Sequence, residues 1–404
     1  MDYRTSSQET IAMDDSPILN PESYLEENMP KLSIFRAISL IIALALVLAA
    51  CAPAATPTPE AAVQTEAPAE PTQPPPPTPT AEPTATPAPQ IGSAERPIKV
   101  LFVPSVDAEK IVASGQLLAE TLNKATGLTF EVVVPTSYAA TLEEMCASPD
   151  DTMGFIPGLG YVLAEQLCGV KVAGKAVRFG YDWYAAMIVV ARDSAYQTVA
   201  DLNGKKWAYP DAASTSGYLY PLYMFKEAGI TPGESVAAGS HDAAIKAVYN
   251  SEADFGTAFF SPPRVDGKAI DWEPGKEADV PADLLESCGP TQDEKALVCG
   301  NFEVRDARRN LRKELPDVAQ KVRILAITPK IPNDTVSFSP DFPEEIMQKI
   351  TEALFAFAQN DPEGFAKAFE AYSWTGINPA TDAEYDPIRF AIQVSGFKIE
   401  DLGK

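Results

Sequence analysis

Three hydroxyl side chains stand in a row just before a predicted helix. Ser214, Thr215 and Ser216 precede Gly217, between a short strand that ends at Tyr209 and an apolar helical stretch. Hydroxyl groups and the free backbone N–H groups of a helix start are hydrogen-bond donors, and a tetrahedral oxyanion needs several donors in one place. The pattern therefore predicts an anion-binding turn. The alternative is a helix cap with spare serines.

The sequence has few groups that could carry out catalysis. His241 is the only histidine, and no motif supplies it with a Ser or Asp partner. There is no CxxC motif and no Cys/His cluster for a metal, and neither a Walker loop nor the glycine pattern of dinucleotide-binding folds is present. We therefore expect no enzymatic activity, no metal site and no cofactor.

Four cysteines besides Cys51 are available for disulfide bonds. Their spacing favours the pairs Cys146–Cys168 and Cys288–Cys299, which an oxidising compartment would permit. Buried free thiols are the alternative for each pair.

Residues 29–51 have the order of a secretion signal. Lys31 and Arg36 precede the apolar run 37–50, which is short for a membrane span and ends in small residues before Cys51. This order resembles the signal peptide and lipobox of bacterial lipoproteins. It implies that Cys51 carries a lipid anchor and that the protein works outside the cytoplasm, in the bacterial cell envelope.

The stretch 1–28 departs from that pattern because it is long, polar and acidic where a short basic segment is expected. The start of translation stays open between Met1, Met13 and Met29.

Residues 52–95 are expected to form a disordered tether. The stretch 52–90 holds 13 of the 37 prolines and has no aromatic residue, Lys or Arg, so it cannot bury enough apolar surface to fold. At about 3 Å per residue it could hold a folded part up to roughly 100 Å from the anchor.

The chain is strongly acidic, with 56 Asp and Glu against 32 Lys and Arg and a formal net charge of −24. This charge argues against nucleic acid or an anionic membrane surface as a partner of the fold. We expect contact with the membrane only through the lipid anchor, and a monomer.

From Arg96 onward, strand and helix patterns alternate, without an internal repeat. Continuous apolar runs such as 98–103 are typical of strands covered on both faces, and together with the alternation they predict an α/β fold with mainly parallel sheets. The expected strands are 98–103, 129–134, 187–191, 207–209, 255–260 and 322–327. The expected helices are 106–125, 138–147, 219–228, 243–250, 344–359 and 362–372.

Six segments occur in the order found in one family of binding proteins. They are Ser137–Ala140, Tyr184–Ser194, Ala200–Lys205, Asp211–Tyr218, Gly239–Ala244 and Ile331–Asp334. Together they resemble the phosphate/phosphite/phosphonate-binding proteins of ABC transporters over about 97–397.

The resemblance implies a periplasmic-binding-protein fold of type II, in which two α/β lobes close over a ligand cleft. Lobe one would combine 97–187 with 331–404, and lobe two would be 188–330. The hinge would consist of two crossing segments, near 184–194 and 328–336.

The resemblance also implies site residues. Ser214, Thr215 and Ser216 would donate to a phospho group from one lobe, and Tyr138 and Tyr184 from the other. His241 would donate from its ring, and Asp334 matches an aspartate close to the ligand in the family. Each has a simpler alternative: a solvated histidine, a tyrosine that fixes its helix to the sheet, and an aspartate in a turn.

Three departures from the family pattern bear on the ligand. Residues 154–160 replace an aromatic-glycine pair, so the cleft wall there is expected to be reshaped. A glutamate that contacts aminophosphonates is missing near Ser261, which favours phosphate, phosphite or a simple alkylphosphonate. Residues 264–303 are longer than the family connection and are expected to form a disulfide-pinned surface loop without a ligand role.

The resemblance therefore implies a lipoprotein that captures a phosphorus oxyanion and delivers it to a membrane permease with a cytoplasmic ATPase. A ligand-sensing ectodomain, or a binder of a different small molecule, is the alternative on the same fold.

Overall fold

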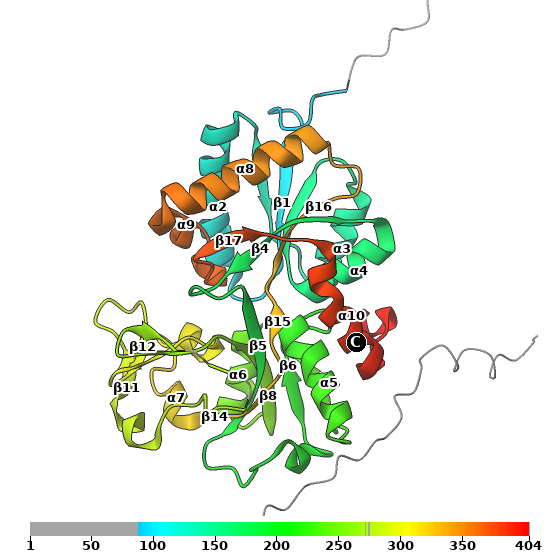
Figure 1. Cartoon of the computed structure of the whole chain (residues 1–404). Coiled ribbons are helices and arrows are strands. Elements are labelled where there is room, and N and C mark those ends of the chain that lie inside the picture. Colours follow the sequence, from blue (N-terminus) through cyan, green and yellow to red (C-terminus); the bar gives the residue numbers. More distant parts are fainter. Residues whose placement is uncertain (1–87, 271, 274, 404) are drawn as a thin grey trace, which may run out of the picture. The chain divides into compact units, whose positions relative to one another are not determined.

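The computed structural model of the protein describes residues 88–403 except 271 and 274 (Figure 1). The expected signal peptide, Cys51 and most of the tether lie outside these residues. Within the described part, no helix combines the length and the apolar character that crossing a membrane would require.

Lobe one is built on a six-stranded mixed sheet. The order across the sheet is β17 (Gly376–Pro379), β4 (Lys171–Val177), β16 (Thr335–Phe338), β3 (Thr152–Ile156), β1 (Ile98–Phe102) and β2 (Phe130–Val133). β1 pairs in parallel with β2 and β3, whereas β4, β16 and β17 run antiparallel to their neighbours.

Helices cover both faces of this sheet (Figure 1). One face carries α2 (Ala108–Thr126), α8 (Glu344–Asn360) and α9 (Pro362–Ala368), and the other carries α3 (Tyr138–Ala147) and α4 (Gly158–Cys168). Ser137 begins α3 because its hydroxyl accepts the Ala140 N–H at 3.1 Å.

Lobe two is built on a second mixed sheet, whose longest strand is β5 (Trp183–Ala191). The segment from Tyr184 to Val190 is buried throughout because α5 (Tyr220–Glu227) covers one face and α6 (His241–Tyr249) the other. The order is β14 (Val322–Ile327), β5, β8 (Phe255–Phe260), β6 (Trp207–Tyr209) and β7 (Ser235–Ala237). Beside it lie η2 (Val199–Leu202), η5 (Ala307–Leu311) and α7 (Val318–Lys321).

The expectation of mainly parallel sheets is wrong. In lobe two, β5 runs antiparallel to both β8 and β14, because the chain enters and leaves this sheet along neighbouring strands. In lobe one, β16 returns antiparallel between β3 and β4 for the same reason.

The lobes are joined by two neighbouring crossings. The first lies between β4 and β5, and the second follows β14 and contains β15 (Ile331–Pro332), which pairs with the start of β5. The first crossing, 178–182, therefore precedes the expected segment 184–194, and residues 183–187, expected in lobe one, pair within the second sheet and the second crossing.

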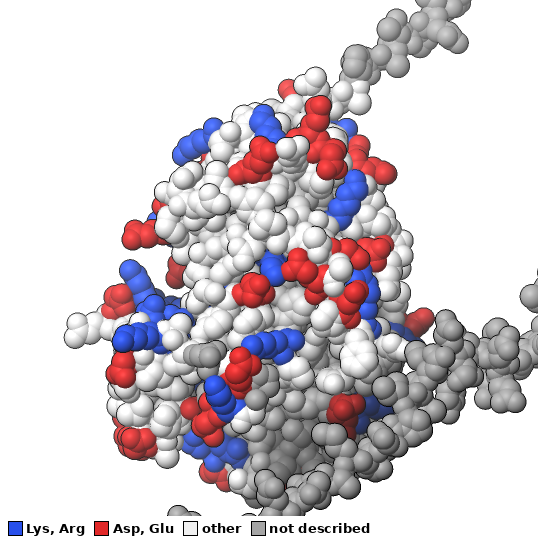
Figure 2. Space-filling view, in the orientation of Figure 1, with Lys and Arg blue, Asp and Glu red and all other residues white. Residues whose placement is uncertain are grey.

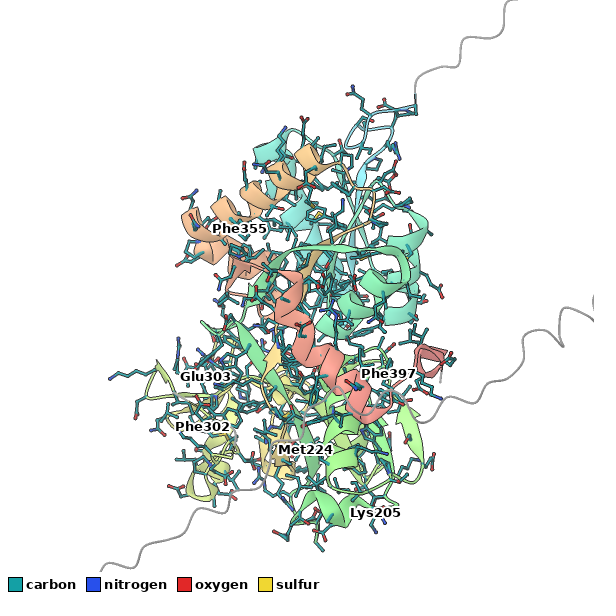
Figure 3. The ribbon with its side chains drawn as sticks, turned by 45° about the vertical axis from the view of Figure 1, so that its right-hand side comes forward. Lys205, Met224, Phe302, Glu303, Phe355 and Phe397 are labelled. Atoms are coloured by element: carbon teal, nitrogen blue, oxygen red, sulfur yellow. A yellow bond between two sulfur atoms is a disulfide. The ribbon has the colours of Figure 1, made fainter. Side chains whose placement is uncertain are left out.

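The C-terminal segment also departs from the expected division. After η7 (Asp382–Tyr385), α10 (Asp386–Ser395) packs against both α4 of lobe one and α5 of lobe two. Phe397, before η8 (Ile399–Gly403), contacts the ring of Tyr218 at 6.2 Å between centroids, beside lobe two (Figure 3). Residues 386–403 thus touch both lobes.

Short strands between 264 and 304 form a small antiparallel sheet where a surface loop was expected. Its order is β10 (Lys268–Ala269), β9 (Arg264–Val265), β13 (Phe302–Val304), β12 (Leu297–Cys299) and β11 (Cys288–Pro290), with η4 (Ala282–Ser287) before β11. Buried Leu297, Phe302 and Val304 attach it to the core of lobe two. Phe302 and Glu303 mark its place in Figure 3.

Both expected disulfide bonds are present. Cys288 and Cys299 lie opposite each other on β11 and β12, and Cys146 at the end of α3 is bonded to Cys168 at the end of α4. The buried-thiol alternative is therefore wrong for both pairs.

Replacing Cys146 and Cys168 together by Ala should lower the free energy of unfolding by about 3 kcal/mol, because the bond closes a loop of this length in the unfolded chain. Urea unfolding of the variant and the parent would measure the difference. An unchanged free energy of unfolding would show that the bond does not restrict the unfolded state.

Candidate ligand-binding site

Four helical segments of the described part begin around one small cavity between the lobes. Tyr138 opens α3, Pro157 precedes α4, Ser214 caps the turn before α5, and His241 opens α6. Helix N-termini present unpaired N–H groups and a partial positive charge, so this convergence favours an anion.

The cavity is small. Its volume is about 30 Å³, roughly two to three times the minimum for one water molecule. A ligand group of a few heavy atoms fits this space. The polar lining consists of Ser105, Tyr138, Arg178, Tyr184, Ser214, Ser216, His241, Asp334 and Tyr372, and the apolar lining of Val103, Val106, Pro157, Phe259 and Ala371.

Lobe two contributes Ser214 and Ser216 from the turn identified in the sequence. The turn is a short π-helical segment, η3 (Thr215–Leu219), in which Ser214 Oγ accepts the Gly217 N–H at 3.0 Å. A Cβ atom at Gly217 would lie 2.0 Å from Pro210 Cγ, so only glycine fits there. Ser214 therefore serves as a helix cap and also faces the cavity.

Thr215 is placed differently from its two neighbours. It is fully buried and does not line the cavity, because its Oγ1 accepts the N–H of Leu159, at the start of α4 in lobe one, at 2.8 Å. Its side chain joins the lobes.

Other hydrogen bonds also join the lobes around the cavity. The N–H of His241 donates to the carbonyl of Ser105 at 3.3 Å, and the N–H of Tyr138 points to Asp211 at 3.5 Å. The structure therefore has the lobes closed on each other at the site.

Three phenols line the cavity. Tyr138 belongs to lobe one, whereas Tyr184 stands on β5 at the crossing and is hydrogen-bonded to Ser216. Tyr184 thus belongs to the second sheet, and not to the opposite lobe as expected. Tyr372 was not expected at the site, and its hydroxyl donates to the carbonyl of Val103 at 2.5 Å. Burial raises the pKa of all three phenols, so they remain neutral donors.

Asp334 lines the cavity as expected, together with a cation that the sequence analysis missed. Arg178 forms an ion pair with Asp334, and also donates to Asn333 Oδ1 at 2.9 Å and to the Tyr372 carbonyl at 3.0 Å. Its guanidinium lies 5.0 Å from the ring centroid of Tyr184. The site therefore holds one positive and one negative charge beside neutral donors.

His241 is buried in the cavity wall rather than solvated. Its ring contacts Phe259 at 5.2 Å between centroids, and its Nδ1 has no hydrogen-bond partner among the described residues. Burial, followed by the charge of Arg178, lowers the pKa of the imidazole to about 3. At neutral pH the ring is therefore uncharged and can donate one hydrogen bond.

This lowered pKa predicts a pH effect on stability. The unfolded imidazole takes up a proton near pH 6.5, whereas the folded one does not until about pH 3. Between these values the unfolded chain binds more protons, so His241 should reduce the free energy of unfolding by up to about 1.4 kcal/mol for each unit of falling pH.

The neighbouring Asp242 has the opposite effect on the free energy of unfolding. Burial raises the pKa of its carboxyl to about 6, so as the pH falls the folded chain takes up this proton before the unfolded chain does. The difference between the parent and a His241→Asn variant isolates the histidine. NMR titration can follow this single imidazole directly, and a pKa near 6.5 in the folded protein would contradict the account.

With this geometry established, comparison with known proteins gives the family. Residues 100–385 match the family of periplasmic substrate-binding proteins of phosphonate ABC transporters. The chain belongs to this family. Its members are transport proteins that bind substrate and are not enzymes, and they work with a permease and an ATPase.

Individual relatives agree with this family assignment. The chain is 27% identical over 328 residues to the phosphate-import protein PhnD of Mycolicibacterium smegmatis, covering 76% of this chain and 89% of that protein.

Solved structures of the family share the fold. A binding protein of an ABC phosphonate transporter from Pseudomonas aeruginosa has a TM-score of 0.55 at 16% identity, covering 76% of this chain and 91% of that chain. PhnD1 of Prochlorococcus marinus, solved with methylphosphonate, has a TM-score of 0.54 at 16% identity, covering 73% and 97%. The type II periplasmic-binding-protein fold expected from the sequence is confirmed.

Proposed function

We propose that this family member captures a phosphorus oxyanion, namely phosphate, phosphite or a simple alkylphosphonate, in the cavity between its lobes. One observation carries the proposal: Ser214, Ser216 and the Arg178–Asp334 ion pair line the same space of about 30 Å³ between the lobes. Donors, one cation and one carboxylate are thereby gathered around a space for one small group.

The donors divide naturally among the oxygens of such an anion. Ser214 and Ser216 would donate from lobe two, Tyr138 from lobe one, and His241 from the start of α6. Arg178 would offset part of the ligand charge, and charge-assisted hydrogen bonds are roughly twice as strong as neutral ones. Because the donors come from both lobes, the ligand would favour the closed state.

Asp334 supplies an acceptor. A partly protonated phospho group has a P–OH hydrogen that a carboxylate can accept, whereas sulfate at neutral pH has none and would face Asp334 with an uncompensated charge. The site should therefore distinguish phosphorus oxyanions from sulfate.

The relatives support this ligand class. The Mycolicibacterium protein is named for phosphate import, and the Prochlorococcus protein was solved with methylphosphonate. Both ligands are small tetrahedral phosphorus anions, which suits the size of this cavity.

Delivery would follow closure. The closed monomer would dock on a membrane permease, whose ATPase drives release and uptake. A lipid on Cys51 and the proline-rich tether would hold the protein near that permease, on the outer face of the membrane.

Replacing Cys51 by Ser should release the protein from the membrane fraction. Retention of the variant in that fraction would contradict the lipid anchor.

Calorimetric titration of the full chain with phosphate, phosphite, methylphosphonate, 2-aminoethylphosphonate and sulfate tests the ligand class. We expect one-to-one binding of at least one of the first three, and sulfate at least about a hundredfold weaker because it lacks the hydrogen that Asp334 accepts. Failure of every phosphorus oxyanion to bind would contradict the proposal.

A further inference from the structure

The first crossing between the lobes begins with a tight turn that carries the cation of the site. The N–H of Arg178 donates to the carbonyl of Tyr181 at 2.9 Å, and the N–H of Tyr181 donates to the carbonyl of Arg178 at 2.9 Å. Between them, Phe179 and Gly180 have left-handed backbones, with φ of 53° and 91°. Two consecutive residues with positive φ are typical of a type I′ turn. The turn therefore fixes the backbone from which the Arg178 side chain reaches the cavity.

Phenylalanine is unusual at the first of these two central positions. A bulky side chain disfavours a positive φ, and type I′ turns favour Asn or Asp before Gly. This chain has such a pair elsewhere, because Asp266 and Gly267, with φ of 52° and 71°, join β9 to β10. The turn itself therefore does not account for the aromatic ring of Phe179.

Two arginines of lobe two lie over this ring. The guanidinium of Arg305 lies 4.4 Å from the ring centroid of Phe179, and that of Arg309 lies 5.4 Å from it. Arg305 directly follows the small-sheet insertion, residues 264–304, and Arg309 belongs to η5. Both distances are within the reach of a cation–π interaction. The ring thus binds lobe two through two cations.

One of these arginines also contacts lobe one directly. Arg309 donates to Ser373 Oγ of lobe one at 2.9 Å, whereas Arg305 pairs with Glu303 of lobe two at 3.3 Å. Figure 2 shows Lys and Arg side chains, with acidic side chains among them, at the left of the view between α9 and the hairpin of β11 and β12. The arginines therefore contact the turn and lobe one where the closed lobes meet.

The turn is linked to the ligand site through the second crossing. Asn333 accepts from the Arg178 guanidinium at 2.9 Å through Oδ1 and donates to the Tyr181 carbonyl at 3.0 Å through Nδ2. It precedes Asp334, the ion-pair partner of Arg178 in the cavity wall. The turn and the side chain of Arg178 are therefore held by the same residue.

We infer that Phe179 is a positioning residue for ligand binding: its ring is bound by the two arginines when the lobes close, and this contact holds the turn that presents Arg178 to the phospho group. The inference rests on the proposed function, since Arg178 must meet a phosphorus oxyanion. Phe179 does not line the cavity itself, so it would act through Arg178.

A contact made in the closed state raises the affinity for a ligand, because the affinity depends on the fraction of protein that is closed. In the open state the ring would lose the arginines, whereas the unfavourable backbone of the turn would remain. Removing the ring should then weaken binding without weakening the fold.

Phe179→Asn tests this inference, because Asn suits a left-handed backbone and has no ring to bind a cation. We expect the phosphate affinity, measured by calorimetry on the full chain, to fall about tenfold, the combined effect of two lost cation–π contacts. Urea unfolding without phosphate should give a midpoint equal to or higher than that of the parent. Phe179→Tyr keeps an aromatic face and should keep the parent affinity.

The matched control is Asp266→Asn, in the equivalent turn of the small-sheet insertion. This residue does not line the cavity, so the variant should bind phosphate as the parent does. Parent-like affinity in Phe179→Asn would overturn the inference, and so would an affinity loss accompanied by a lower unfolding midpoint. Phe179→Tyr binding as weakly as Phe179→Asn would overturn it as well.

A double-mutant cycle asks whether the ring acts through an arginine. Arg305→Gln removes the nearer cation, so Phe179→Asn should cause a smaller loss of affinity in this background than in the parent. Equal losses in the two backgrounds would contradict a contact between ring and cation. Failure of the parent itself to bind phosphate would instead contradict the proposed function.

Discussion

Replacing Arg178 by Gln should weaken phosphate binding by between roughly thirtyfold and several thousandfold, the range expected when one member of a buried charge pair is removed. The variant loses the cation that lines the cavity and leaves Asp334 unpaired beside an anionic ligand. The same substitution should lower the free energy of unfolding by about 3–5 kcal/mol, because an uncompensated buried charge remains.

Arg308→Gln is the matched control for this loss. Arg308 is also buried, and it pairs with Asp279 at 2.7 Å and Asp306 at 2.9 Å in lobe two, away from the cavity. Its loss should reduce stability by a similar amount, yet leave the affinity of the folded protein for phosphate close to that of the parent. Equal affinity losses in the two variants would show that Arg178 acts only through stability.

Ser216→Ala should weaken phosphate binding by about tenfold to a hundredfold, which is the effect of removing one hydrogen bond to a charged group. Ser216 lines the cavity, is almost fully buried and is hydrogen-bonded to the Tyr184 phenol. Unlike Ser214, it does not cap the helix, so its replacement should lower the free energy of unfolding by only about 1 kcal/mol, the cost of the lost hydrogen bond to the Tyr184 phenol.

The control for this variant is Ser194→Ala. Ser194 has a buried hydroxyl without a partner among the described residues and lines a different cavity in lobe two. Calorimetry should give the parent affinity for this variant. Parent-like affinity in Ser216→Ala would mean that its hydroxyl does not reach the ligand.

Local sequence patterns predicted part of the framework around the site, although the expected helix 243–250 began after His241 and the expected strand 187–191 missed Tyr184. The expected bounds of α3, β6, β8 and β14 agree with the structure, because each has a cap or a continuous apolar run within a few residues. The hydroxyl turn at 214–216 was recognisable for the same reason.

Features that depend on contacts between distant residues could not be predicted from local sequence patterns. Arg178 is separated from Asp334 by 156 positions, and nothing beside it in the sequence indicates that a carboxylate will neutralise it in a cavity wall. Tyr372 likewise reaches the carbonyl of Val103 only through the packing of the C-terminal part against β1. In the sequence alone, a buried arginine cannot be distinguished from an exposed one, because its partner is distant in the chain.

The small-sheet insertion was missed because its strands are only two or three residues long. Their apolar side chains gain burial only when they lie against lobe two, so alternation along the chain is too brief to predict them. The helix α10 was not predicted, and the whole of 331–404 was expected in lobe one. Its packing against both α4 and α5 depends on tertiary contacts that the local sequence does not reveal.

The most direct test of the central claim is a crystal structure of the protein grown with methylphosphonate. We expect the phosphorus atom inside the cavity between the lobes, with its oxygens within hydrogen-bond distance of Ser216, Tyr138 and Arg178. A methylphosphonate bound elsewhere on the protein, with this cavity still closed and filled only by water, would contradict it.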